Sequence, residues 1–214
     1  MTSAANRNGP TNRNGRGGNA LNPMAEDEIT ATAQRDRRKR IIDATMTFAD
    51  KGGFDAVQMR AVAERADVAL GTLYRYFPSK IHLLVAGLVR ELERIQERLD
   101  RAPVRGDTPY ERLLFVLGRL TRAFQRNPNL SEAVTRALMS ADASAATEVD
   151  AANRMMEGMF IAVMSDGEPS EEQVAVARVI GDVWLSNLVA WVTRRASATD
   201  VSNRLELTVR LLLR

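Results

Sequence analysis

The stretch VALGTLYRYFPSK, Val68 to Lys80, gathers two tyrosines, an arginine and a phenylalanine into one short helical segment. Aromatic residues make up only 5% of the chain, so this concentration is local. A buried helix would carry leucines at these positions, and a solvated helix would not need two tyrosines. Side chains with an apolar body and a polar tip suit a surface that meets another molecule.

The residues just before this stretch, MRAVAERAD from Met59 onward, predict another short helix, and the residues ADVA join the two. Two short helices connected by a tight turn are typical of a helix-turn-helix, whose second helix enters the DNA major groove while the first braces it. Close crossing needs small or apolar residues, which the segment supplies as Ala63, Ala66, Val68 and Leu73. The segment therefore predicts a DNA-binding module.

Three residues of this module suit contacts to DNA bases. Gly71 and Thr72 have little bulk, so the backbone of the recognition helix can approach base edges closely. The methyl and hydroxyl groups of Thr72 can meet a thymine methyl group or a phosphate. Arg60, early in the bracing helix, can reach a guanine with its bidentate guanidinium group.

Three other residues suit the phosphate backbone. Tyr74 and Tyr76 carry hydroxyl groups at the reach of phosphate oxygens. Lys80 adds a positive charge where the next helix begins, beside backbone amides that favour anions. Phe77, by contrast, is expected in the core. An alternative stays open, in which the tyrosines are half-buried packing groups and Lys80 is an ordinary residue of a helix start.

The sequence MRAVAERADVALGTLYRYFPSK resembles the DNA-binding signature of the TetR family of bacterial repressors. The resemblance implies a homodimer whose last two helices form a four-helix bundle, an operator that is an inverted repeat, and a ligand pocket in the C-terminal domain. Asp67 stands where the family usually has a turn glycine, Ala69 where it has a serine cap, and Val57-Gln58 where it has a Thr or Ser. Leu70 replaces a usual basic or polar residue and can contact a thymine methyl group instead. Taken together, the residues expected to contact DNA are Arg60, Leu70, Gly71, Thr72, Tyr74, Arg75, Tyr76 and Lys80.

Composition limits the class of protein. The chain has 214 residues, enough for one large domain or two small ones, and its 45% hydrophobic and 27% charged residues are ordinary for a soluble globular protein. It has no run of about 18 apolar residues, no apolar core of a signal peptide and no cysteine. We therefore expect a cytoplasmic, nucleoid-associated protein without a membrane span, disulfide, thiolate zinc site or cysteine nucleophile.

Positive charge gathers in the N-terminal part of the chain. Residues 1–80 carry 13 Lys and Arg against 9 Asp and Glu, whereas residues 81–214 carry 17 against 18. A basic module on a neutral body indicates an anionic partner at one end. A chance fluctuation is the alternative.

Most of the chain has helical periodicity. Residues 1–30 are rich in Asn and Gly and poor in large apolar side chains, so we expect a disordered tail there. Beyond it no alternating stretch is long enough for a strand. The expected fold is all-α with about nine helices, divided into a DNA-binding domain over residues 31–78 and an effector-binding and dimerisation domain over residues 79–214. Capping boxes at Thr108–Glu111 and Ser170–Gln173, and the pair Thr199-Asp200, mark three helix starts, and the helix from Ser170 is expected to run to about Arg195.

The C-terminal domain carries adaptable and aromatic residues that suit a cavity for a large, flat, apolar ligand. Methionines gather on one expected helix and tryptophans on another, although ordinary packing between helices explains each residue equally well. The residues expected to line an effector pocket are Leu88, Phe115, Met155, Met159, Trp184, Asn187 and Trp191. Arg194-Arg195, near a helix end, can serve an anionic group or simply the helix dipole.

Further stretches resemble the branch of the TetR family that represses cholesterol and steroid catabolism genes. They include AQRDRRKRIIDAT, RNPNLSEAVTRAL, ADASAATEVD and DVWLSNLVAWVTRRASATDVSNRLEL, and the likeness covers most of Gln34 to Leu212. It implies an effector that is a CoA thioester of a steroid acid. Two alternatives stay open: a regulator of another lipid or xenobiotic pathway, and a helical adaptor that does not bind DNA.

No set of residues indicates catalysis. His82 is the only histidine, and no Ser-His-Asp set, glycine-rich phosphate loop or ligand cluster accompanies it. The carboxylates are scattered and offer no pair for acid–base chemistry. We expect a structural role for His82, and neither enzyme activity nor a metal or cofactor.

Overall fold

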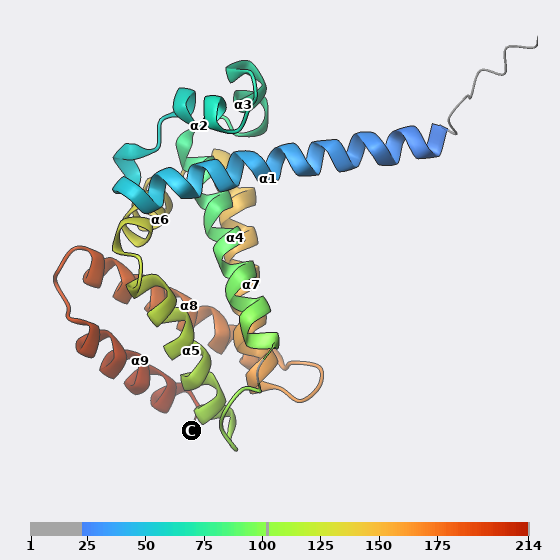
Figure 1. Ribbon diagram of the computed structural model, residues 1–214. Coiled ribbons are helices and arrows are strands. Elements are labelled where there is room, and N and C mark those ends of the chain that lie inside the picture. Colours follow the sequence, from blue (N-terminus) through green and yellow to red (C-terminus); the bar gives the residue numbers. More distant parts are fainter. Residues whose placement is uncertain (1–22, 102, 214) are drawn as a thin grey trace, which may run out of the picture. The chain divides into compact units, whose positions relative to one another are not determined.

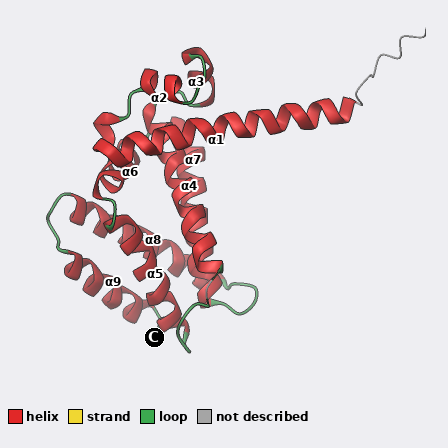
Figure 2. Ribbon diagram, viewed as in Figure 1, coloured by secondary structure: helices red, strands yellow, loops and turns green. Residues whose placement is uncertain are grey.

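The computed structural model describes residues 23–101 and 103–213, which form nine α-helices and one short 3-10 helix, with no strand among them (Figures 1 and 2). The expected all-α fold is thereby confirmed. Residues 1–22, where most of the expected tail falls, lie outside the described residues. Helix α1, Pro23–Ala56, begins earlier than the boundary expected near residue 30. Proline at the first helical position and the good helix formers that follow it explain the earlier start.

The chain divides after Arg35 into two units, and residues 36–214 form the larger one. Within it, α1 is interrupted at Gly52 and Gly53, whose φ angles are −152° and 69°. The positive φ of Gly53 favours glycine, and a Cβ there would lie 2.6 Å from Oε2 of Glu132. The two glycines therefore interrupt the helical conformation before the last residues of α1.

The helix-turn-helix consists of α2, Met59–Arg65, and α3, Leu70–Tyr76. The two helices pack against each other, and they bury Val62, Ala63 and Leu73. Both predicted helices are therefore present, and the small residues lie at their crossing.

The turn between α2 and α3 depends on Asp67, which has a φ of 53° in the left-handed region. Its amide donates to the carbonyl oxygen of Glu64 at 3.2 Å, and the amide of Val68 donates to that of Ala63 at 3.0 Å. This pair of hydrogen bonds is the Schellman pattern, in which glycine usually occupies the left-handed position. Asp67 thus fills the position where the family pattern predicted a glycine.

Helix α4, Lys80–Asp100, begins after Ser79, whose hydroxyl oxygen accepts a hydrogen bond from the amide of Ile81 at 3.2 Å. Buried side chains recur along its whole length, because its apolar residues follow the helical period. Gly87 lies where α1 approaches α4, and a Cβ at Gly87 would collide with Sδ of Met46. The absence of a side chain at Gly87 therefore permits this close approach.

Five further α-helices complete the larger unit. They are α5, Pro109–Gln125, α6, Pro128–Ser140, α7, Ala146–Met164, α8, Glu171–Val192, and α9, Ala198–Leu212, and the 3-10 helix η1, Ala143–Ala145, precedes α7. The capping boxes expected at Thr108 with Glu111 and at Ser170 with Gln173 are confirmed.

Two expected helix ends are wrong. Helix α8 ends at Val192 and not near Arg195, because Arg194 adopts a φ of 59° and closes a second Schellman pattern. Helix α9 is capped by Ser197 and not by Thr199. The Ser197 hydroxyl oxygen accepts a hydrogen bond from the amide of Asp200 at 3.1 Å, and the carboxylate of Asp200 accepts one from the Ser197 amide at 2.8 Å.

The buried side chains form two clusters. The N-terminal cluster joins α1, α2, α3 and the first turns of α4 with Ala133 and Ala137 of α6. The body cluster joins the rest of α4, from Leu88 onward, with α5, Val134 of α6 and α7 to α9. Helix α4 therefore belongs to both clusters, and the N-terminal core continues past the expected domain boundary at residue 78.

Helices α8 and α9 pack side by side and leave apolar side chains exposed. Val179 of α8 is 45% exposed, and Leu207 and Leu211 of α9 are 45% and 53% exposed. By length and composition alone α8 would also pass as a membrane span, the one helix in residues 23–101 and 103–213 that does so. The core helix of a water-soluble protein meets the same criteria, and α8 contributes Ile180 and Trp184 to the body cluster.

Candidate nucleic-acid interface and effector site

Six of the eight residues that the sequence assigned to DNA lie on α3, and the other two, Arg60 and Lys80, lie at the starts of α2 and α4. Of these, Gly71, Tyr74 and Arg75 are exposed, while Leu70, Thr72 and Tyr76 are half-buried. No heavy atom outside the helix lies within 4 Å of a Cβ built on Gly71, so this end of α3 faces open space. Phe77 is buried, which confirms its expected place in the core.

Basic side chains of α1 and α2 lie against the same module. Arg60 is exposed at the start of α2. The guanidinium carbon of Arg38 lies 5.3 Å from the ring centroid of Phe77, and Nε of Arg40 donates to the carbonyl oxygen of Ala66 at 3.3 Å. Sequence reasoning missed these α1 residues, although the run RRKR, Arg37–Arg40, directly before the first buried residues was a usable signal.

Lys80 does not project freely into solvent. Its Nζ lies 4.0 Å from the ring centroid of Phe54 and 3.5 Å from the carbonyl oxygen of Phe54. Arg136 of α6 contacts the same ring at 4.4 Å and pairs with Asp55 at 3.0 Å, a contact that raises the pKa of Arg136. A phosphate would therefore compete with Phe54 for the Lys80 ammonium group.

His82 is buried and hydrogen-bonded at both ring nitrogens. Its Nδ1 lies 2.9 Å from the hydroxyl oxygen of Ser79, and its Nε2 lies 3.1 Å from the carbonyl oxygen of Ser144. Since a carbonyl oxygen only accepts, Nε2 donates to Ser144 and Nδ1 accepts from Ser79. His82 therefore ties the start of α4 to η1, as the expected structural role requires.

The residues expected to line an effector pocket all belong to the body cluster or pack against it, with one exception. Leu88, Met159 and Trp184 are buried in the cluster, while Phe115, Met155 and Trp191 are half-buried against it. The exception is Asn187, which is buried on α8 but is not a member of the body cluster. A small cavity of about 10 Å³ lies between Trp184, Trp191 and Thr121, and it brings together only these two tryptophans of the seven expected pocket residues. This cavity is too small for a large apolar ligand.

Trp184 and Asn187, both buried on α8, carry polar groups. Nε1 of Trp184 donates to the hydroxyl oxygen of Thr121 at 3.2 Å, and the Trp184 ring meets Phe124 edge-on with centroids 5.1 Å apart. Asn187 donates to the carbonyl oxygen of Val183 at 2.8 Å, but its Oδ1 is buried without a partner in the described part of the chain. A buried acceptor left unpaired is costly, so Asn187 offers a hydrogen bond to a donor that enters the body.

Two other depressions lie at the surface of the body. One of about 200 Å³ lies between α7 and α8 beside Met156 and Gly181. Another, of about 440 Å³ and wide open, lies at the α8–α9 turn beside Arg194, Arg195 and Trp191. The expectation that the two arginines lie at a helix end is confirmed. No group of three or more His, Cys, Asp or Glu suited to a metal ion occurs among the described residues.

Known proteins share both parts of this architecture. Residues 41–86 match the family described as "Bacterial regulatory proteins, tetR family", and residues 106–212 match "Tetracyclin repressor-like, C-terminal domain". The chain is 66% identical to the HTH-type transcriptional repressor KstR of Mycolicibacterium smegmatis, over 89% of the chain and 93% of that protein. It is 64% identical to KstR of Mycobacterium tuberculosis, over 89% of the chain and 86% of that protein.

Solved structures agree with these matches. A TetR transcriptional regulator from Rhodococcus sp. RHA1 is 30% identical with a TM-score of 0.79, covering 85% of this chain and 97% of its own. FadR of Thermus thermophilus, a TetR-family repressor solved with lauroyl-CoA, has a similar fold, with 22% identity, a TM-score of 0.64 and coverage of 82% and 93%. With its helix-turn-helix and its helical body, the chain belongs to the TetR family of transcriptional repressors and is not an enzyme.

Proposed function

We propose that this chain represses genes of cholesterol and steroid catabolism, that it binds an inverted-repeat operator as a cytoplasmic homodimer, and that a CoA thioester of a steroid acid releases it. The observation that supports this most strongly is the identity of 64–66% to two KstR repressors over 89% of the chain. That likeness extends through the body, where the DNA-binding motif imposes no constraint. It therefore supports a shared effector class as well as a shared mode of DNA binding.

The DNA-facing roles follow from the exposed face of α3. Gly71 and Thr72 lie at its N-terminal end, where a recognition helix contacts base edges. Tyr74 and Arg75 are exposed beyond them and suit phosphates. Arg60 supplies the base contact of the bracing helix. Lys80 reaches a phosphate only by leaving Phe54, so its role in binding depends on that exchange.

The exposed apolar side chains of α8 and α9 support a dimer. Val179, Leu207 and Leu211 would be costly to leave in water, and a second copy of the same two helices would cover them. Two-fold symmetry would then hold two recognition helices roughly 34 Å apart or somewhat more, in successive major grooves on one side of the DNA.

The small cavity beside Trp184 and Trp191 supports a switch in which the effector separates helices to enter. A cavity of about 10 Å³ cannot hold a steroid. Binding at this place requires the surrounding helices to move, and α4, which packs in the same body cluster, continues directly from the helix-turn-helix. Asn187, with its unpaired Oδ1, would accept a hydrogen bond from a hydroxyl or amide group of the effector.

Operator selection followed by effector titration tests this function. Selection from random duplexes should yield an inverted repeat, and fluorescence anisotropy should then show its release by a steroid CoA thioester. Reciprocity requires the operator to weaken effector binding by the same factor, typically about 5–150-fold. No palindromic site, or equal effector affinities with and without operator, would refute the proposal. Release by a fatty acyl-CoA but not by the steroid thioester would assign the chain to another lipid pathway.

A further inference from the structure

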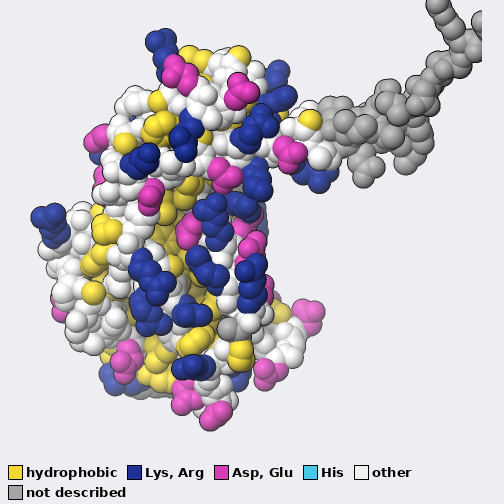
Figure 3. Space-filling model, viewed as in Figure 1, with side chains coloured by type: hydrophobic (Ala, Val, Ile, Leu, Met, Phe, Trp, Pro, Cys, Tyr) yellow, Lys and Arg dark blue, Asp and Glu magenta, His cyan; other side chains and the backbone are white. Residues whose placement is uncertain are grey.

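Helices α4 and α5 form a groove whose walls are rich in arginine. A cavity of about 140 Å³ lies between Arg98 of α4 and Arg119, Arg122 and Arg126 of α5, with Ile95 and Leu99 at its apolar side. Figure 3 shows Lys and Arg side chains gathered over this face with apolar surface between them. The three α5 arginines recur at i, i+3 and i+7, which places them on one face of the helix.

These arginines are poorly neutralised. Glu91 is the only carboxylate that lines the groove, and it pairs with Arg98 at 3.2 Å. No carboxylate of the described chain forms an ion pair with Arg119, Arg122 or Arg126. Four guanidinium groups against one carboxylate make a concave, positively charged site beside an apolar wall, and such a site attracts anions.

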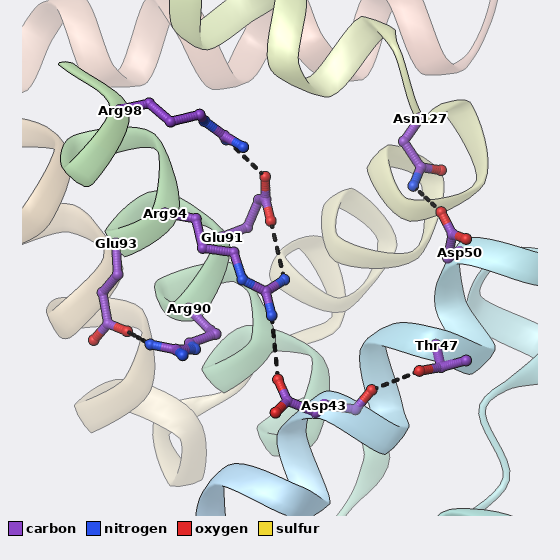
Figure 4. A network of polar contacts seen from close by, with 9 residues as sticks. All are labelled: Asp43, Thr47, Asp50, Arg90, Glu91, Glu93, Arg94, Arg98 and Asn127. Carbon is purple, nitrogen blue, oxygen red and sulfur yellow. Dashed lines mark hydrogen bonds and ion pairs between the residues drawn. The ribbon is translucent and has the colours of Figure 1, made fainter. Parts of the chain in front are cut away.

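Arg98 also connects the groove to the DNA-binding module. Glu91 bridges Arg98 at 3.2 Å and Arg94 at 3.5 Å, and Arg94 in turn contacts Asp43 of α1 at 3.2 Å (Figure 4). Asp43 lies next to the residues of α1 that build the N-terminal cluster. An anion that binds Arg98 would break its ion pair with Glu91. Glu91 would then pair with Arg94 alone, and the ion pair between Arg94 and Asp43 would change in strength.

We propose that this groove binds the phosphates of a 3′-phosphorylated adenine nucleotide, the charged part of a CoA thioester. This rests on the proposed function, in which the effector is an acyl-CoA. Arginine suits phosphate because its planar fork donates two parallel hydrogen bonds. CoA carries both a ribose 3′-phosphate and a pyrophosphate, so it engages several arginines at once. A free nucleotide bisphosphate would use the same contacts.

Calorimetric titration of the full chain tests the site without DNA. Wild-type protein should bind CoA and adenosine 3′,5′-bisphosphate, and it should bind dephospho-CoA about tenfold more weakly, since a charge-assisted contact is lost. The double variant Arg119→Gln/Arg122→Gln should weaken CoA binding by about tenfold or more for the same reason. Arg154→Gln is the matched control, because Arg154 is exposed on α7 and lies outside the groove, so it should bind CoA as the wild type does.

The site is overturned if the wild type shows no CoA binding, or if the folded double variant binds CoA as tightly as the wild type. Operator binding is measured separately by anisotropy, so its failure would sink the proposed function and leave the CoA result intact. Release of the double variant at an unchanged concentration of steroid thioester would keep the proposed function and overturn the groove. Tight binding of the free bisphosphate without binding of CoA would overturn the assignment to the effector.

The connection to α1 has its own test. Arg94→Gln removes the contact with Asp43 but leaves the groove arginines in place, so CoA affinity should stay within about twofold of the wild type. The factor by which CoA thioester weakens operator binding should fall toward one. An unchanged factor in Arg94→Gln would show that the signal travels by another route.

Discussion

Replacing Gly71 with alanine separates DNA contact from the stability of the fold. In the free protein, a Cβ at Gly71 meets no heavy atom outside the helix within 4 Å. Alanine is more favourable than glycine inside a helix by roughly 0.5–1 kcal/mol. Gly71→Ala should therefore raise the free energy of unfolding by up to that amount.

Operator binding should change in the opposite direction. If the N-terminal end of α3 approaches base edges, the added methyl group occupies space that a base needs. One disturbed base contact costs about 1–3 kcal/mol, on the scale of a mismatched base pair. A dimer suffers this cost at both half-sites, so its affinity should fall roughly 30-fold or more.

Gly158→Ala provides the matched control. Gly158 is an exposed glycine inside α7, and a Cβ there also meets nothing within 4 Å. This variant should gain similar stability and keep its operator affinity. Urea unfolding and fluorescence anisotropy at fixed salt measure the two quantities. Wild-type operator affinity in a stabilised Gly71→Ala protein would refute the reasoning that this end of α3 lies against the bases.

Three other substitutions test single contacts. Lys80→Ala should reduce the salt slope of operator binding by about 0.9 for each subunit of the dimer if Lys80 holds a phosphate. A loss of stability with an unchanged slope would show that Lys80 contacts Phe54 and no phosphate. Asp67→Gly should raise the free energy of unfolding by up to about 1 kcal/mol, because glycine adopts positive φ without strain, and a less stable variant in urea unfolding would contradict this. Hydrogen bonds in the α9 cap lower the pKa of Asp200, so its contribution to stability exists at neutral pH and is lost as pH falls through the folded pKa. Asp200→Asn should therefore flatten the acid side of a melting-temperature profile, and an unchanged profile would exclude this role.

Local signals accounted for the helices. The capping boxes at Thr108 and Ser170 are chemical signals within a few residues, so the sequence predicted those helix starts correctly. The end of α8 was missed because Arg194 adopts a positive φ. Arginine rarely adopts this conformation, so its presence in the sequence does not indicate a helix end. The cap of α9 was missed because Thr199 and Ser197 offer the same hydroxyl chemistry, and only the observed hydrogen bond distinguishes them.

The site depends on contacts between residues far apart in the chain. The sequence predicts that Lys80 binds a phosphate. In the structure, however, its ammonium group contacts the ring and the carbonyl oxygen of Phe54, 26 residues away in the chain. The spacing of the α5 arginines predicts that they share one face of a helix. Neighbouring residues in the sequence do not predict which other helix lies against that face. Pocket residues could be assigned to a domain and not to a cavity, because the cavity depends on how α5 and α8 pack.

The start of α4 is held from two sides. On one side, His82 connects Ser79 to the carbonyl oxygen of Ser144 beside α7. On the other, Phe54 meets Lys80 through its ring and Glu132 through its amide, at 2.8 Å. The first set of contacts joins the start of α4 to η1, and the second joins α1 to both α4 and α6.

These contacts constrain how an effector in the body can reach α3. If α4 were the only connection, its tilt would move the module freely, and small shifts would be absorbed at residues 77–79. Because η1 holds the start of α4 and α6 holds α1, a tilt of α4 must either carry these segments along or break their contacts. Two discrete arrangements are then favoured over a continuous hinge, since a packed contact is either made or lost. The ion pair of Arg94 with Asp43 adds a third such contact farther along α4. An effector that breaks only one of these three contacts would weaken operator binding only in part. Full release therefore requires a ligand that acts on more than one contact. Under the proposed function, a CoA thioester would act on more than one by placing its apolar acid in the body and its phosphates in the arginine groove.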